Sequence, residues 1–92
     1  MAGLDGVWAV RRTGGLLPPL IGVRKRIAGA QGETAVGPLP GISFEVVGTS
    51  LRYLPPFAGF VDVLEAETPD DYRGRATFRG REFGRFRMRR IA

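Results

Sequence analysis

Glycine and proline interrupt this chain so often that few long uninterrupted segments remain, and this limits the possible folds more than any other feature. The 92 residues include 14 glycines and 7 prolines. Between them, valine, isoleucine, phenylalanine and tyrosine alternate with polar residues. No stretch combines a sustained helical period with helix-favouring composition. Alternation bounded by turn residues is typical of half-buried strands, so the sequence predicts an all-β fold.

The alternating segments predict about eight short strands joined mostly by tight connections. The expected strands cover residues 4–12, 20–29, 33–37, 42–47, 50–54, 59–67, 72–79 and 83–91. A flat antiparallel meander would leave open edges and exposed apolar surface, whereas closure into a barrel removes both. We therefore expect residues 1–92 to form a single small antiparallel up-and-down β-barrel domain.

The clearest hairpin is FEVVGTSLRY, residues 44–53. Glycine is the preferred first residue of a type II′ turn, so Gly48-Thr49 is expected to form a two-residue turn. This turn pairs Phe44 with Tyr53 on the face that we expect to be buried.

A second hairpin is expected over residues 25–36, with a turn at Gln31-Gly32 that pairs Ile27 with Val36. A third joins the strands at 59–67 and 72–79 through TPDD, where proline and aspartate favour a turn. This third register places Val61 opposite Phe78 on the inner face.

Arginine alternates with small or apolar residues in RATFRGREFGRFRMRR, residues 75–90. A three-residue loop at 80–82 makes the faces of the two strands agree, because a shift of one residue would mix them. That loop sets small residues opposite large ones on the concave face: Gly84 opposite Phe78, Ala76 opposite Phe86 and Gly74 opposite Met88. The convex face then carries a ladder of arginines, which we expect Asp62 on the neighbouring strand to offset in part.

The two ends of the sequence resemble the calycin group, which contains the lipocalins and fatty-acid-binding proteins. The resemblance rests on Gly6-x-Trp8 in the first strand and on Arg89-Arg90 in the last. It implies that Arg90 lies over the Trp8 indole as a cation–π pair, worth about 0.5–2 kcal/mol. The chain is shorter than a typical lipocalin and has no counterpart of its long loops and C-terminal helix. The interior is therefore expected to be small.

The candidate ligand-binding residues lie on the predicted inner face of the barrel. They are Trp8, Lys25, Phe44, Tyr53, Phe86, Met88 and Arg90. The apolar members would line a pocket or, equally well, form an ordinary packed core. Lys25, or else Arg90, would receive an anionic head group by a charge-assisted hydrogen bond. Lys25 could instead act as a base, or extend to solvent at a barrel end.

Two further features have alternative interpretations. Glu65 and Glu67 are expected on the inner face, where they would transfer protons or, more simply, pair with Arg90. The apolar Pro-Pro segments at 16–22 and 52–60 would form a portal, cover a barrel end or provide a homodimer contact.

We expect the barrel to bind a small hydrophobic or amphipathic molecule in its interior. The alternatives are a cofactor-free enzyme of the isomerase or cyclase type, and polyanion binding through the eight arginines of residues 72–92. Nucleic acid is less favoured, because base stacking needs exposed rings and the predicted outer row has almost none.

The absence of cysteine and histidine excludes disulfides, thiolate chemistry and the commonest metal ligand. No phosphate-binding or dinucleotide motif occurs, so no metal or cofactor is expected. The sequence also has no basic-then-apolar leader and no apolar run long enough to span a bilayer, so a cytoplasmic location is expected.

Overall fold

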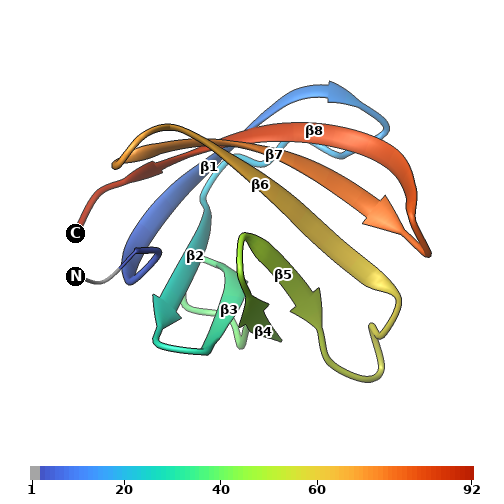
Figure 1. Ribbon diagram of the computed structural model, residues 1–92, viewed down its shortest axis with the longest axis horizontal. Coiled ribbons are helices and arrows are strands. Elements are labelled where there is room, and N and C mark those ends of the chain that lie inside the picture. The colour runs from blue at the N-terminus through green and yellow to red at the C-terminus, as the bar shows by residue number, and fades with distance from the viewer. Residues whose placement is uncertain (1–2) are drawn as a thin grey trace.

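The protein is a closed barrel of eight antiparallel strands, seen in a computed structural model that describes residues 3–92 (Figure 1). The strands are β1 (Gly6–Gly15), β2 (Val23–Ala28), β3 (Gln31–Val36), β4 (Ile42–Val47), β5 (Ser50–Tyr53), β6 (Phe60–Thr68), β7 (Asp71–Phe78) and β8 (Arg81–Arg90). Each strand pairs with its neighbours in sequence, and β1 pairs with β8 to close the ring. The predicted fold class is therefore confirmed. Within residues 3–92 there is no helix that could cross a membrane.

The barrel has two different ends. Four connections meet at one end, which we call the open end: residues 16–22, 37–41, 54–59 and 79–80. The chain termini and the turns at 29–30, 48–49 and 69–70 lie at the other, the closed end. In Figure 1 the termini lie on the left and the β7–β8 turn lies on the right.

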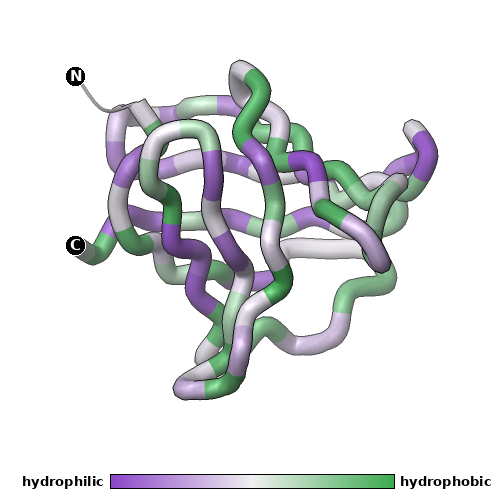
Figure 2. The backbone as a smooth tube through the Cα atoms, turned by 90° about the horizontal axis from the view of Figure 1, so that it is seen from below, coloured by the Kyte–Doolittle hydropathy of each residue, from purple (hydrophilic) through white to green (hydrophobic). Residues whose placement is uncertain are grey.

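The core follows the alternation of the strands, visible as changing colour along the tube in Figure 2. Its largest fully buried side chains are Trp8, Phe44, Leu51 and Met88, and Phe86 is also buried. Burying each such side chain contributes about 1.5–3 kcal/mol. The inward direction of these predicted residues is confirmed.

The predicted hairpin at residues 44–53 has the expected register, with Phe44 opposite Tyr53. Gly48 has a φ of 62°, a conformation that glycine adopts without the strain a side chain would bring. Local turn chemistry and the apolar pattern agree here, so the sequence determines the pairing.

The predicted register of the β2–β3 hairpin is wrong. Ile27 pairs with Gly32 and Val23 pairs with Val36, so the turn falls at 29–30. Gly32 is not a turn residue. A Cβ at this position would lie 2.7 Å from the Phe44 ring, so only glycine leaves room for that ring. The missing side chain makes room for a core aromatic.

The β7–β8 register also differs from the prediction. The turn is Arg79-Gly80, with φ values of 51° and 85°, and the register shifts at a bulge between Ala76 and Thr77. Small residues still face large ones, now as Gly74 opposite Phe86. Over most of β7 the observed pairing differs from the predicted one by two residues. A shift of two leaves each side chain on the same face, so the predicted faces are still correct there.

Phe78 was expected inside and instead lies at the surface. It is 38% exposed, and its ring packs against Phe60 at a centroid distance of 4.6 Å. The early turn at 79–80 places it at the open end of the barrel, beyond the packed core.

The faces of β6 are the reverse of those predicted. Asp62 and Leu64 point inward and are buried. Val61 and Val63 take the outer face and pair with Thr77 and Arg75 of β7. A valine-rich segment with phenylalanine and leucine in the alternate positions offers two apolar faces, so apolarity alone could not choose between them.

Glu65 and Glu67, expected inside, are therefore exposed on the outer face. Each pairs with Arg73, at 3.4 and 3.2 Å respectively, and Glu67 also contacts Arg87. These glutamates, and not Asp62, offset the charge of the arginine ladder.

Candidate functional site

Lys25 lies in the barrel interior, and its ammonium group is fully engaged. It is 3% exposed, because β2 directs it inward between Val23 and Ile27. Nζ donates hydrogen bonds to Thr34 Oγ1 at 2.7 Å, Tyr53 Oη at 2.8 Å and Asp62 Oδ2 at 2.9 Å. An ammonium has three protons, so none remains for a further acceptor.

Four residues from four strands form this polar cluster: Lys25, Thr34, Tyr53 and Asp62. The Tyr53 hydroxyl donates to Asp62 Oδ2 at 2.8 Å and lies 2.7 Å from Thr34 Oγ1. Because Tyr53 donates to Asp62, its oxygen accepts from both Lys25 and Thr34. A buried ion pair is stable only when its remaining polar groups are satisfied, and this cluster meets that requirement for its donors.

The cluster shifts two pKa values away from neutrality. Burial alone would lower the pKa of Lys25, but the Asp62 carboxylate and the Tyr53 hydroxyl raise it above its ordinary 10.5. Burial raises the pKa of Tyr53 above 10.0, against the opposing effect of the Lys25 charge. These pKa shifts keep Lys25 an ammonium and Tyr53 a neutral hydroxyl at neutral pH.

An apolar pocket of about 230 Å³ opens above the cluster, at the open end of the barrel. Its walls are largely aliphatic and aromatic, and its polar side chains come mainly from the cluster. The lining residues are Leu17, Thr34, Ile42, Tyr53, Phe57, Phe60, Asp62, Ala76, Thr77 and Phe83. Small-molecule sites commonly combine apolar walls with a few fixed polar groups in this way.

One polar atom of the pocket is left without a partner. Both hydrogen bonds to Asp62 reach Oδ2, and Oδ1 receives none from the residues that the structure describes. No fully enclosed side-chain oxygen or nitrogen in residues 3–92 lacks a hydrogen bond. Oδ1 therefore reaches the pocket surface, although Asp62 as a whole is only 7% exposed. It is a carboxylate acceptor at the floor of an apolar pocket.

The predicted apolar binding residues divide between pocket and core. Tyr53 lines the pocket, whereas Phe44, Phe86 and Met88 pack beneath it and are buried. The Lys25 ammonium lies 5.6 Å from the Phe44 ring centre and 5.3 Å from that of Phe86. These rings provide a lower wall for the polar cluster.

Trp8 and Arg90 lie at the closed end, away from this pocket. The Arg90 guanidinium lies 4.3 Å from the Trp8 ring centre, the contact that the family resemblance implied. Arg90 also donates to the carbonyls of Gly3, Asp5 and Pro69 and to the Asp70 carboxylate, at 2.8–3.0 Å for three of the four. Four of its five N–H donors are therefore used to join the N-terminal segment and the β6–β7 turn to β8.

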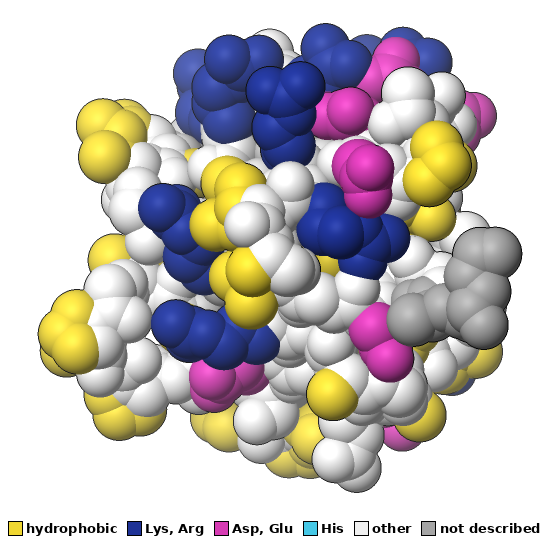
Figure 3. Space-filling model, turned by 90° about the vertical axis from the view of Figure 1, so that its left-hand side faces the viewer, with side chains coloured by type: hydrophobic (Ala, Val, Ile, Leu, Met, Phe, Trp, Pro, Cys, Tyr) yellow, Lys and Arg dark blue, Asp and Glu magenta, His cyan; other side chains and the backbone are white. Residues whose placement is uncertain are grey.

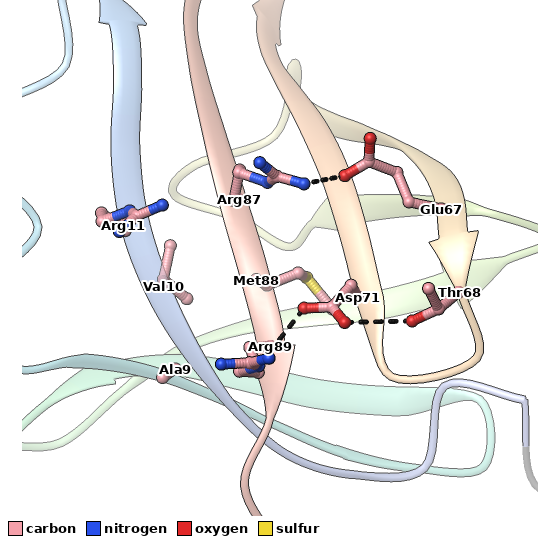
Figure 4. Close-up of a pocket in the computed structure, with 9 residues that line it drawn as sticks. All are labelled: Ala9, Val10, Arg11, Glu67, Thr68, Asp71, Arg87, Met88 and Arg89. Atoms are coloured by element: carbon pink, nitrogen blue, oxygen red, sulfur yellow. Dashed lines mark hydrogen bonds and ion pairs between the residues drawn. The ribbon is translucent and has the colours of Figure 1, made fainter.

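The outer face of β1, β7 and β8 carries the arginines. Figure 3 shows them along the upper edge of the molecule, interleaved with carboxylates. A shallow depression of about 580 Å³ lies on this face (Figure 4). In it, Arg87 contacts Glu67, and Asp71 lies 3.4 Å from Arg89 and accepts from Thr68 at 3.0 Å. Its polar groups largely satisfy one another.

Two members of the cluster, Thr34 and Asp62, were not recognised as site residues from the sequence. The one available signal is an aspartate between two valines in a predicted strand, which is costly to bury without a partner. Lys25, an isolated lysine on an apolar face of another strand, supplies that partner.

No metal-ligating group of three or more side chains occurs in residues 3–92. In comparisons with protein-family models, with curated proteins and with solved structures, none matched this chain. The function must therefore be argued from the site itself.

Proposed function

We propose that the barrel binds a small, neutral, mostly apolar molecule in the open-end pocket, through a hydroxyl or N–H that donates to Asp62 Oδ1. The observation that carries this proposal is the unpartnered carboxylate oxygen at the floor of an apolar pocket. A carboxylate oxygen in an apolar pocket can form a charge-assisted hydrogen bond with a ligand that supplies the donor.

The charge of the cluster supports a neutral ligand. Lys25 and Asp62 form an ion pair at 2.9 Å, and every ammonium proton has a partner. An anionic head group would meet the Asp62 carboxylate without a free cation to compensate it. The expected Lys25 or Arg90 contact with an anion is therefore replaced by a donor contact to Asp62.

Binding is favoured over proton-transfer catalysis. A general acid or base works best when its pKa lies near the working pH. The pKa values of Lys25 and Tyr53 both move upward, away from neutrality. The cluster is suited to fixing a ligand's orientation.

A calycin-like relationship is part of the proposal. It is supported by Arg90 over Trp8 and by closure of β1 onto β8. In this arrangement one end of the barrel is sealed and the other receives the ligand.

Isothermal titration with 2-naphthol and 2-methylnaphthalene tests the proposal, because the two probes differ in a hydroxyl and a methyl group. A hydrogen bond to a charged acceptor contributes about 1.5–3 kcal/mol, so 2-naphthol should bind at least about tenfold more tightly. The matched control is Lys25→Met with Asp62→Leu, which should bind both probes equally. Failure of both probes to bind would refute the pocket, and equal affinities in the unmodified protein would refute the role of Asp62.

A further inference from the structure

The three most exposed large apolar side chains of residues 3–92, and a fourth that is less exposed, lie at the open end of the barrel. Leu16 is 87% exposed, Ile21 88%, Leu39 64% and Phe57 41%. All four lie in the open-end connections at 16–22, 37–41 and 54–59. Phe57 and Leu17, the residue after Leu16, line the pocket, so two of these connections border it.

The charges at this end are mainly positive. The open-end connections contain no aspartate or glutamate, and Arg79 is their only charged residue. Three more arginines adjoin them: Arg12 donates to the Gly15 carbonyl at 2.6 Å, Arg24 follows the first residue of β2, and Arg81 begins β8.

Within residues 3–92 the four open-end arginines form no ion pair, and neither do Arg11, Arg52 and Arg75 on the strands. Among the residues that the structure describes, the ion-paired cations are Lys25, Arg26, Arg73, Arg85, Arg87, Arg89 and Arg90. None of the open-end arginines is in this set. The nearest carboxylate in sequence, Glu82, is already paired with Arg85 at 2.7 Å.

The closed end has the opposite character. Its turns and adjoining residues carry Asp5, Glu45, Asp70 and Asp71. Among residues 3–92, the strongly exposed large apolar residues there are Val47 and Ile91, each 50% exposed. The two ends therefore differ: the open end has apolar tips and unpaired guanidinium groups, whereas the closed end has carboxylates together with ion-paired arginines.

We propose that the open end docks onto the surface of an anionic lipid bilayer. Leu16, Ile21, Leu39 and Phe57 would enter the interfacial region, while the four arginines contact lipid phosphates. Apolar side chains flanked by basic residues favour this position, and each basic residue near an anionic surface strengthens binding. Guanidinium groups bind phosphate oxygens in a bidentate manner.

A bilayer fits this surface better than a second copy of the chain. In a two-fold dimer the same surface faces itself, so the open-end arginines would approach their own equivalents. Like charges brought together at an interface oppose association. A phosphate-rich surface instead supplies the missing anions.

This proposal does not depend on what occupies the pocket. If both proposals hold, the pocket mouth faces the lipid, and an apolar ligand passes between bilayer and barrel without crossing water. Vesicle binding without ligand binding would support the docking proposal alone. Ligand binding without vesicle binding would support the pocket proposal alone.

Vesicle co-sedimentation tests the docking. One vesicle preparation is phosphatidylcholine alone, and the other contains about 30% phosphatidylglycerol. The full chain should bind the anionic vesicles at least about tenfold more tightly, and added salt should weaken the binding. No binding to the anionic vesicles would overturn the proposal.

Two pairs of variants locate the surface. Leu16→Ser with Ile21→Ser should lower vesicle affinity by at least about tenfold, because both side chains leave the interface. The matched control, Val47→Ser with Ile91→Ser at the closed end, should bind as the parent does. Arg79→Gln with Arg81→Gln should also weaken binding, whereas the closed-end change Arg26→Gln should not.

Equal losses in the open-end and closed-end variants would overturn the assignment. Analytical ultracentrifugation of the same proteins completes the test. The parent protein could form a dimer that Leu16→Ser with Ile21→Ser abolishes and the other variants do not. If the same double variant left vesicle binding unchanged, the surface would be assigned to a second copy instead.

Discussion

The two ends of the barrel use similar residue types for different purposes. At the closed end, Trp8 is fully buried and donates to the Leu4 carbonyl at 2.9 Å, while Arg90 covers its ring. At the open end, the aromatic side chains of Phe57 and Phe60 border a pocket whose floor contains an unpartnered oxygen of Asp62. The comparison indicates that the closed end mainly stabilises the fold. The open end is less stabilising, because it keeps a polar group accessible.

The largest effect should come from removing one partner of the buried ion pair. Asp62→Ala leaves Lys25 charged and buried, which should cost about 3–5 kcal/mol in unfolding free energy. Replacing both residues, as Lys25→Met with Asp62→Leu, should restore most of that loss. Urea denaturation of the three proteins measures both effects. Equal stabilities for the single and double variants would show that the ion pair is not desolvated.

High pH should weaken the same cluster without mutation. The folded-state pKa values of Lys25 and Tyr53 are raised, so folding holds their protons more tightly than the unfolded chain does. Their stabilisation is complete below the unfolded pKa values and is lost as pH rises through the folded ones. Unfolding free energy should therefore fall above about pH 10, and less so in Lys25→Met with Asp62→Leu. A pH-independent unfolding free energy in this range would contradict the shifts.

Gly74→Ala should destabilise the part of the barrel wall where β7 packs against β8, between the two ends. A Cβ at position 74 would lie 2.2 Å from the Phe86 ring, and overpacking of this kind costs about 1–3 kcal/mol. Phe86→Leu in the same chain should recover part of the loss by making room. Thermal denaturation of Gly74→Ala alone and with Phe86→Leu tests this, and an unchanged midpoint for Gly74→Ala would contradict the packing.

Arg90→Met should have an effect confined to the closed end. Methionine keeps an apolar cover over Trp8 but loses the cation–π contact and four hydrogen bonds, most of them exposed, so a cost of about 1–3 kcal/mol is expected. The affinity for 2-naphthol should not change, because Arg90 does not line the open-end pocket. A loss of ligand affinity comparable to that of an Asp62 variant would erase the distinction between the ends.

The sequence predicts the barrel and its closure, because these depend on patterns that repeat along the chain. Hairpin 44–53, the inward Trp8 and Met88, and the β1–β8 pairing follow from alternation and turn chemistry. The sequence did not determine which face of β6 points inward, because both faces contain apolar residues and Asp62 is expected in solvent. Only the long-range contact with Lys25, 37 residues away, makes the inward choice favourable.

The predicted β2–β3 register failed because a glycine serves packing instead of a turn, whereas the β7–β8 register failed because of a bulge and an earlier turn. Gly32 was interpreted as a turn residue, but it makes room for Phe44 from a different strand. The shape of the pocket was likewise beyond prediction, because its walls come from two connections and six strands whose spacing depends on the completed barrel. Sequence patterns predict side-chain direction more reliably than they predict empty space.

Closure of β1 onto β8 also ties the two ends of the chain together. The Val7 amide donates to the Ala92 carbonyl at 3.1 Å, and the Ile91 amide donates to the Val7 carbonyl at 2.7 Å. A short peptide linker could therefore join them in a circular permutant cut at the 48–49 turn, with every strand pair intact. Reporter groups fused at either terminus would project from the side opposite the pocket and leave its mouth accessible.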